Sequence, residues 1–230
     1  MLFITDEINK VIFGWSAKSG CSHIKKIFWY LKTGNENHQI HIQPEYDIIP
    51  DDSENYTIIL FVRNPYERLV SGFLDCYRKG SGGYYSKWKE STLTFSNFVE
   101  YLLKDDWDII DRHHFTPIAS EFFNENLIKN SKEYIIYDIK NIDYKKLETI
   151  YNKTIPPSLI AFKGDHIRRE TELLENPVYN LDMELYFNYK VPVRFFYNKE
   201  LKQKVYDYFK FDFEYLKKHG FDYDKELILE

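Results

Sequence analysis

A short glycine-containing stretch, WSAKSGCSHIKK (residues 15–26), carries the residue types of an anion-binding loop. Lys18 precedes Gly20, whereas a Walker-type phosphate loop carries its lysine after the last glycine, directly before a Ser or Thr. If the loop joins a strand to a helix, the backbone N–H groups from Ser19 to Ser22 and the Ser22 hydroxyl point toward a bound anion. The stretch therefore predicts an anion site whose lysine lies on the N-terminal side of the loop.

A second polar cluster follows an apolar run, in VRNPYERLVSGF (residues 62–73). The Arg63 guanidinium can bind a phosphate through two parallel hydrogen bonds, and Ser71 follows it on the next predicted helix. A structural ion pair with Glu67 or Asp75 is the alternative role for Arg63. Two loops suited to anions predict a ligand with two separated anionic groups.

Alternating apolar runs predict the elements that position these loops. The predicted strands are residues 10–15, 56–62 and 133–139, and the predicted helices are residues 21–32, 65–79, 94–104, 144–153 and 198–220, the last as one or two helices. This alternation predicts an α/β, three-layer fold with a central, mostly parallel sheet flanked by helices. Both loops follow carboxyl ends of strands, where such sheets bind ligands. Residues 155–195 show no clear hydrophobic period, which predicts irregular structure. Arg68, one turn into the predicted helix 65–79, is expected to pair with an acidic residue.

Length and composition limit the class of protein. The chain has 230 residues and a formal charge of −5, which predicts one domain over residues 1–230 and no nucleic-acid partner. It shows no apolar run long enough to span a membrane and no basic leader, so we expect a soluble, cytoplasmic or otherwise intracellular protein with no membrane partner. Cys21 and Cys76 form no disulfide framework, which fits a reducing compartment. The oligomeric state stays open.

These residues resemble a known family, the sulfotransferases. AKSGCSHIKK is similar to the family's 5′-phosphosulfate loop, with Ala17 in place of the usual proline and Ile24 where many members carry a tryptophan. VRNPYERLVSGF is similar to the 3′-phosphate motif, with Arg63 and Ser71 at the family's spacing. The likeness continues in DRHHFTPI (111–118), EYIIYDIKNID (133–143) and the closing helices (194–223). The combination resembles the glycan-type branch, which includes chondroitin and heparan O-sulfotransferases, and implies their P-loop-like fold.

The resemblance implies a donor and the residues that bind it. The donor would be 3′-phosphoadenosine 5′-phosphosulfate, and no metal would be required. Lys18 would act in catalysis by meeting the bridging oxygen between phosphate and sulfuryl group. The implied acceptor is a hydroxyl group, on a glycan or another hydroxyl-bearing molecule. The residues implied in donor binding are Lys18, Ser19, Gly20, Cys21, Ser22, His23, Arg63 and Ser71.

The general base is harder to place from the residues. His41, in QIHIQPEYD, resembles the catalytic histidine that heparan O-sulfotransferases carry between the two phosphate motifs. A neutral imidazole with a pKa near 6.5 suits proton removal at neutral pH. His38 and Glu45 in the same stretch are alternatives, and His114 is either a base or a supporting residue.

Other readings of the same residues predict different proteins. A nucleotide-dependent kinase is one alternative, and a protein that binds adenosine bisphosphate without turnover is another. Cys21 at a helix start could act as a nucleophile, but the arginine of a phosphatase loop is missing. His113 and His114 have no third ligand at metal spacing, so the sequence predicts no metal site. Residues 78–91 predict a glycine-rich loop, in which three aromatic side chains could stack on a sugar: Tyr84, Tyr85 and Trp88.

Overall fold

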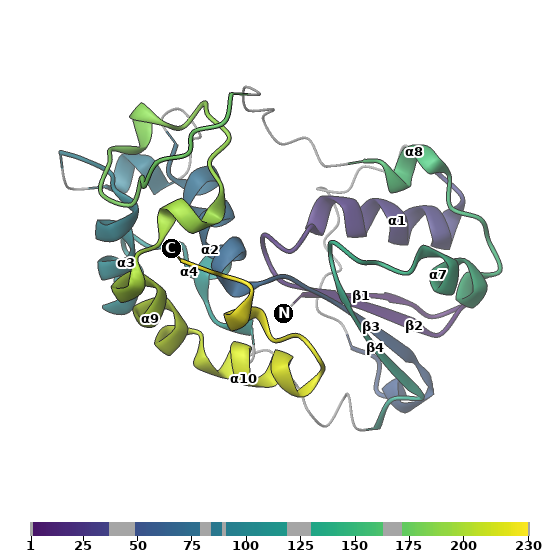
Figure 1. Ribbon diagram of the computed structural model, residues 1–230. Helices are drawn as coiled ribbons and strands as arrows, with labels where there is room; N and C mark the ends of the chain where they lie inside the picture. The colour runs from purple at the N-terminus through teal and green to yellow at the C-terminus, as the bar shows by residue number, and fades with distance from the viewer. Residues whose placement is uncertain are drawn as a thin grey trace. The chain divides into compact units, whose positions relative to one another are not determined.

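The computed structural model describes residues 2–36, 49–78, 84–88, 91–118, 130–162 and 172–229. The chain divides into two compact units (Figure 1). Unit 1 comprises Met1–Arg63 and Phe122–His166, and unit 2 comprises Asn64–Glu121 and Ile167–Glu230. The predicted single domain over residues 1–230 stays a prediction.

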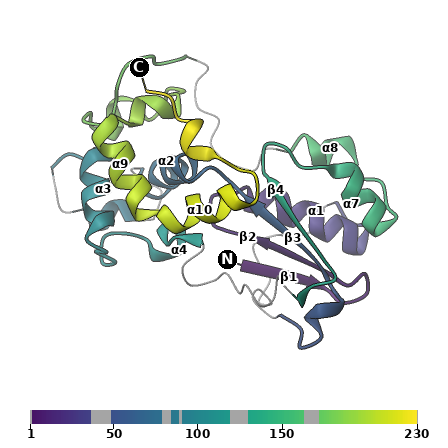
Figure 2. The ribbon, with the colours of Figure 1, turned by 60° about the horizontal axis from the view of Figure 1, so that its bottom comes forward.

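Unit 1 contains a sheet in which four strands can be described, in the order β1 (Leu2–Asp6), β2 (Val11–Trp15), β3 (Thr57–Val62) and β4 (Glu133–Asp138). Strands β2, β3 and β4 are parallel, and β1 is antiparallel to β2 (Figure 2). Every residue of β2 and β3 is buried, as their continuous apolar sequences predict. The expectation of a mixed α/β fold with a mostly parallel sheet is confirmed, whereas its three-layer and P-loop-like details remain predictions.

Strand β1 was not predicted from the sequence. It pairs with β2 through a tight turn in which the Asp6 carboxylate accepts hydrogen bonds from the N–H groups of Ile8 and Asn9. Lys10 closes the turn in a left-handed conformation, with φ 54°. The run LFITD is too short for its alternation to stand out, so pairing with β2 decides its conformation.

Three helices of unit 1 lie on one face of the sheet: α1 (Cys21–Thr33), α7 (Tyr144–Tyr151) and α8 (Pro157–Ile160) (Figure 1). Alternate residues of the strands, such as Phe13 and Phe61, pack with Phe28 of α1 and Leu147 of α7 in a shared apolar core. Helix α1 ends at Thr33, and its C-cap residue Gly34 adopts φ 79°, a left-handed conformation that glycine favours. This core fixes the direction in which α1 leaves the loop after β2.

Unit 2 is mainly helical and has an aromatic core. Its longer helices are α2 (Pro65–Cys76), α3 (Phe95–Leu103), α9 (Lys199–Tyr208) and α10 (Lys210–Lys218), with the single turn α4 (Arg112–Phe115). The C-terminal helical region is therefore two helices, which separate at Phe209. Helix α2 ends before the predicted residue 79, because the Tyr77 side chain turns inward and donates a hydrogen bond to the Ile109 carbonyl (2.8 Å).

Short 3₁₀ turns complete the described structure: η1 (Ser53–Asn55), η2 (Tyr84–Lys87), η3 (Met183–Leu185), η4 (Val193–Phe196) and η5 (Tyr223–Lys225). The described part of residues 155–195 contains α8, η3, η4 and irregular chain, in line with its lack of a sequence period. None of the described helices is long and apolar enough to cross a lipid bilayer.

Candidate functional site

The loop after β2 forms a tight turn whose residues from Ser16 to Ser19 are buried. The Ser19 N–H donates to the Ser16 carbonyl (3.1 Å), and the hydroxyls of these two serines lie 2.7 Å apart. Lys18 adopts a left-handed conformation with φ 65°, although it is not glycine. Its side chain is largely buried. The turn is therefore held by its own hydrogen bonds before any ligand binds.

Gly20 is the N-cap of α1, and it offers no side chain to satisfy the first N–H groups of the helix. It adopts φ 73°, and a Cβ atom at this position would lie 3.5 Å from the Ile139 side chain. Cys21 is a partly exposed thiol, whereas Ser22 is buried. The first turn of α1 carries no acidic residue. A helix start with these properties suits an anion, which would bind the backbone N–H groups.

Arg63 lies at the carboxyl end of β3, next to this loop. Its Nη1 atom donates a hydrogen bond to the Lys18 carbonyl oxygen, at 3.0 Å. Because Trp15 of β2 pairs in register with Phe61 of β3, the two segments leave the sheet at the same edge. Two of the residues that the sequence assigned to different anion groups are thus in direct contact.

The His23 side chain is held by two contacts within unit 1. Its Nδ1 donates to the Phe162 carbonyl (2.8 Å), and its Nε2 accepts from the Tyr144 hydroxyl (2.9 Å). Burial lowers the pKa of His23, although the hydrogen bond to Phe162 opposes this effect. The neutral imidazole therefore joins α1 to α7 and to the chain after α8. An anion in the loop would meet the His23 backbone N–H and not its ring.

Lys25 is a cation near the loop that was not predicted from the sequence to belong to the site. Its ammonium lies 5.8 Å from the centre of the Trp15 ring, and the side chain is mostly buried. Burial lowers the pKa of Lys25, and the neighbouring Cys21 thiol opposes that shift. Nothing in the sequence distinguishes Lys25 from its neighbour Lys26. Only the position of Lys25 on the buried face of α1 does so.

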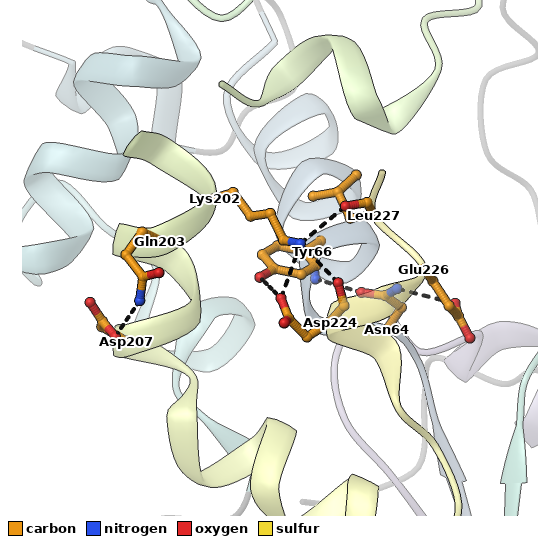
Figure 3. A network of polar contacts seen from close by, with 8 residues as sticks. All are labelled: Asn64, Tyr66, Lys202, Gln203, Asp207, Asp224, Glu226 and Leu227. Carbon is orange, nitrogen blue, oxygen red and sulfur yellow. Dashed lines mark hydrogen bonds and ion pairs between the residues drawn. The ribbon is translucent and has the colours of Figure 1, made fainter. Parts of the chain in front are cut away.

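In unit 2, a polar network holds the first turn of α2 (Figure 3). Asn64 caps the helix by accepting a hydrogen bond from the Tyr66 N–H (3.0 Å), and its amide donates to Glu226 (3.3 Å). The Tyr66 hydroxyl donates to the Asp224 carboxylate (2.9 Å). Lys202 of α9 binds the carbonyl oxygens of Asp224 and Leu227 (2.9 and 3.1 Å). The residues that directly follow Arg63 are thereby fixed to the C-terminal segment.

Ser71 and Arg68 lie further along α2. Ser71 is half-buried, and its predicted convergence with Arg63 on one phosphate stays a prediction. Arg68 is buried, donates to the Thr116 carbonyl (3.1 Å) and forms an ion pair with Asp212 (3.7 Å). The structural role expected for Arg68 is confirmed.

His114 lies in α4, whose N-cap is Asp111. The Asp111 carboxylate accepts hydrogen bonds from the His113 N–H (3.0 Å) and from Nδ1 of His114. Burial opposes the ionisation of Asp111, but these hydrogen bonds keep its pKa below the usual value. His114 is therefore an oriented imidazole in unit 2, and its role as a base stays an alternative.

The aromatic residues of the glycine-rich loop pack onto unit 2. The rings of Tyr84 and Trp88 each lie 6.1 Å from that of Tyr77. Tyr85 donates to Glu184 (3.3 Å), and both residues line a cavity of about 140 Å³. A stacking role on a sugar stays a prediction for these three residues.

Three sequence-predicted residues lie outside the described residues: His38, His41 and Glu45. The preferred base is thus not placed by the structure. The structure describes the other predicted donor-binding residues, which are the loop from Lys18 to His23, Arg63 and Ser71. Of these, Arg63 contacts the loop through the Lys18 carbonyl.

A model of the sulfotransferase family matches residues 1–219, which include both loops. The chain belongs to the sulfotransferase family. No curated protein and no solved structure matches it significantly. The expectation that this sulfotransferase is an enzyme of sulfuryl transfer is confirmed at the level of the family. Its donor, its acceptor and the glycan-type branch remain predictions.

Proposed function

We propose that this sulfotransferase transfers a sulfuryl group from 3′-phosphoadenosine 5′-phosphosulfate to a carbohydrate hydroxyl, as a member of the glycan-type branch. The observation that carries the proposal is the hydrogen bond from Arg63 to the Lys18 carbonyl. It joins the 5′-phosphosulfate loop to the arginine of the 3′-phosphate motif. Two adjacent sites of positive charge suit a donor with two separate anionic groups. They suit a triphosphate less well, because a triphosphate binds in a single cradle.

The described residues suit the donor's 5′-phosphate. Gly20 caps α1 without a side chain, so the N–H groups of Cys21, Ser22 and His23 have the helix-start position that phosphates prefer. Arg63 would bind the 3′-phosphate together with Ser71 of α2. His23 contributes indirectly, because its ring holds the start of α1 against Tyr144.

Sulfuryl transfer in this scheme is an in-line displacement. The acceptor oxygen forms a bond to sulfur as the bond between sulfur and the bridging oxygen breaks, and the phosphate side leaves with the electron pair. The Lys18 ammonium stabilises the negative charge that develops on the bridging oxygen. A base takes the proton of the acceptor hydroxyl, and His41 is preferred for this step over His38, Glu45 and His114.

Loss of the Lys18 ammonium tests the proposal. The purified chain is incubated with the donor and a panel of glycans, and release of adenosine 3′,5′-bisphosphate is measured. Lys18→Ala is expected to reduce the rate at least about 100-fold, because a charge-stabilising group is lost from the transition state. Lys146→Ala, which removes an exposed ion pair with Glu133, is the matched control and should retain activity. Turnover that survives Lys18→Ala would remove this role for Lys18.

Ligand stabilisation separates the two alternatives. A nucleotide-dependent kinase predicts a larger rise in melting temperature with ATP and Mg²⁺ than with adenosine 3′,5′-bisphosphate. A silent binding protein predicts stabilisation by the bisphosphate with no sulfation of any acceptor. Replacement of His41 should abolish turnover while bisphosphate binding persists, since a base acts on the acceptor.

A further inference from the structure

Cys76, Asp111 and His114 bring three metal-ligating side chains together in unit 2. One ligand atom from each residue lies within 4.8 Å of the other two. Cys76 is the last residue of α2, Asp111 caps α4 and His114 lies within α4. Cys76 and Asp111 are buried, and His114 is half-buried. The cluster thus combines a sulfur, an oxygen and a nitrogen ligand from two separate helices.

The protein scaffold holds these residues in place without a ligand. The Tyr77 hydroxyl donates to the Ile109 carbonyl (2.8 Å) and accepts from the Asp111 N–H (3.3 Å), which fixes the cap of α4 to the end of α2. The two helices approach closely at Gly72, where a Cβ atom would lie 2.5 Å from the Phe115 ring. Packing on both sides of the cluster therefore fixes the distance between Cys76 and α4.

We propose that Cys76, Asp111 and His114 bind a divalent transition-metal ion of the zinc class. Thiolate, carboxylate and imidazole are the ligands that Zn²⁺ takes in proteins, whereas Mg²⁺ and Ca²⁺ prefer oxygen ligands alone. Three protein ligands leave one position of a tetrahedral ion for water. The Cys76 thiol loses its proton to the solvent when the ion binds. The site does not depend on the proposed sulfuryl transfer.

Binding would have a structural consequence and a catalytic one. The ion would join the end of α2 to α4, which adds a cross-link to unit 2. It would also withdraw the His114 imidazole from the role of base, because the ring would serve as a ligand. The sequence did not predict the site, since Cys76 is distant in the chain from the histidine pair.

Cobalt spectroscopy of the full chain, without an affinity tag, tests the proposal. Co²⁺ is added to protein that has been treated with a chelator, and we expect one equivalent to bind with a thiolate-to-metal charge-transfer band. Zn²⁺ should displace the Co²⁺ and raise the melting temperature. Cys76→Ser is expected to abolish the band and to weaken Zn²⁺ binding at least about 100-fold, since the loss of even a supporting residue weakens metal sites 10- to 100-fold. Cys21→Ser, which removes the other thiol, should leave both signals unchanged.

Asp111→Asn separates metal binding from folding. Asparagine retains an N-cap acceptor, so α4 should form as before, while the anionic ligand is lost. Weaker Zn²⁺ binding with an unchanged melting temperature in chelator supports the site. The proposal is overturned if wild-type protein binds no Co²⁺, or if Cys76→Ser or Asp111→Asn binds Zn²⁺ as the wild type does. The cluster would then be a helix cap with a hydrogen-bonded histidine only.

Discussion

His23 illustrates how one side chain can hold a loop through contacts within the protein. Its ring accepts a hydrogen bond from Tyr144 through Nε2, and this requires the neutral imidazole. Protonation would place an N–H group against the Tyr144 hydroxyl and add a charge to a mostly buried site. The lowered pKa of His23 follows mainly from this burial.

A pH-dependent loss of stability should follow from His23. Its folded-state pKa lies below the unfolded value of about 6.5, so the unfolded chain binds more protons between the two values. The contribution of His23 to stability is therefore complete above about pH 6.5 and declines as the pH falls below it. The difference in unfolding free energy between wild type and His23→Gln, measured by urea denaturation from pH 7.5 to 5.5, should shrink. A difference that does not change with pH would contradict this assignment.

At the scale of elements, the C-terminal segment completes the start of α2. Asp224 and Glu226 bind Tyr66 and Asn64, and Tyr223 in η5 is almost fully buried. This segment lies beyond residue 219, where the match to the sulfotransferase family ends. Its contacts nevertheless reach the helix that carries the 3′-phosphate motif, so we expect it to contribute to the stability of unit 2.

Replacing Tyr223 should destabilise the fold more than replacing a nearby exposed residue. Tyr223→Ala removes a buried aromatic ring and is expected to lower the free energy of unfolding by about 3–5 kcal/mol. Ile228→Ala, in the same segment but with an exposed side chain, should change it by less than about 0.5 kcal/mol. Urea denaturation measures both values. Equal stability of the two variants would show that the segment is not part of the folded unit.

At the scale of the whole molecule, the sequence predicted the elements that have strong periods. Strands β2, β3 and β4 and helix α1 lie within one residue of their predicted bounds. Strand β1 was not predicted, because its five residues are too few to show a hydrophobic alternation. The predicted end of α2 was too late, because the inward turn of Tyr77 depends on its hydrogen bond to Ile109. Local pattern thus predicts elements well, but contacts between distant segments decide where they end.

The residues of the candidate site were also predicted only in part. Lys18 and Arg63 were identified by residue type and position, and their contact follows from the parallel register of β2 and β3. The partners of His23 and the cluster at Cys76 could not be predicted, because each joins residues far apart in the chain. The family match extends this knowledge to the reaction class, but not to the acceptor.

The left-handed backbone at Lys18 has a consequence for the stability of the entire protein. A side chain with a Cβ atom is less stable in this conformation than glycine, by about 1 kcal/mol. Lys18→Gly should therefore unfold at a higher urea concentration than Lys18→Ala, although both variants lack the ammonium and should be equally inactive. Equal unfolding midpoints would contradict a strained backbone. In its proposed role, Lys18 would therefore occupy a position where glycine gives the more stable fold.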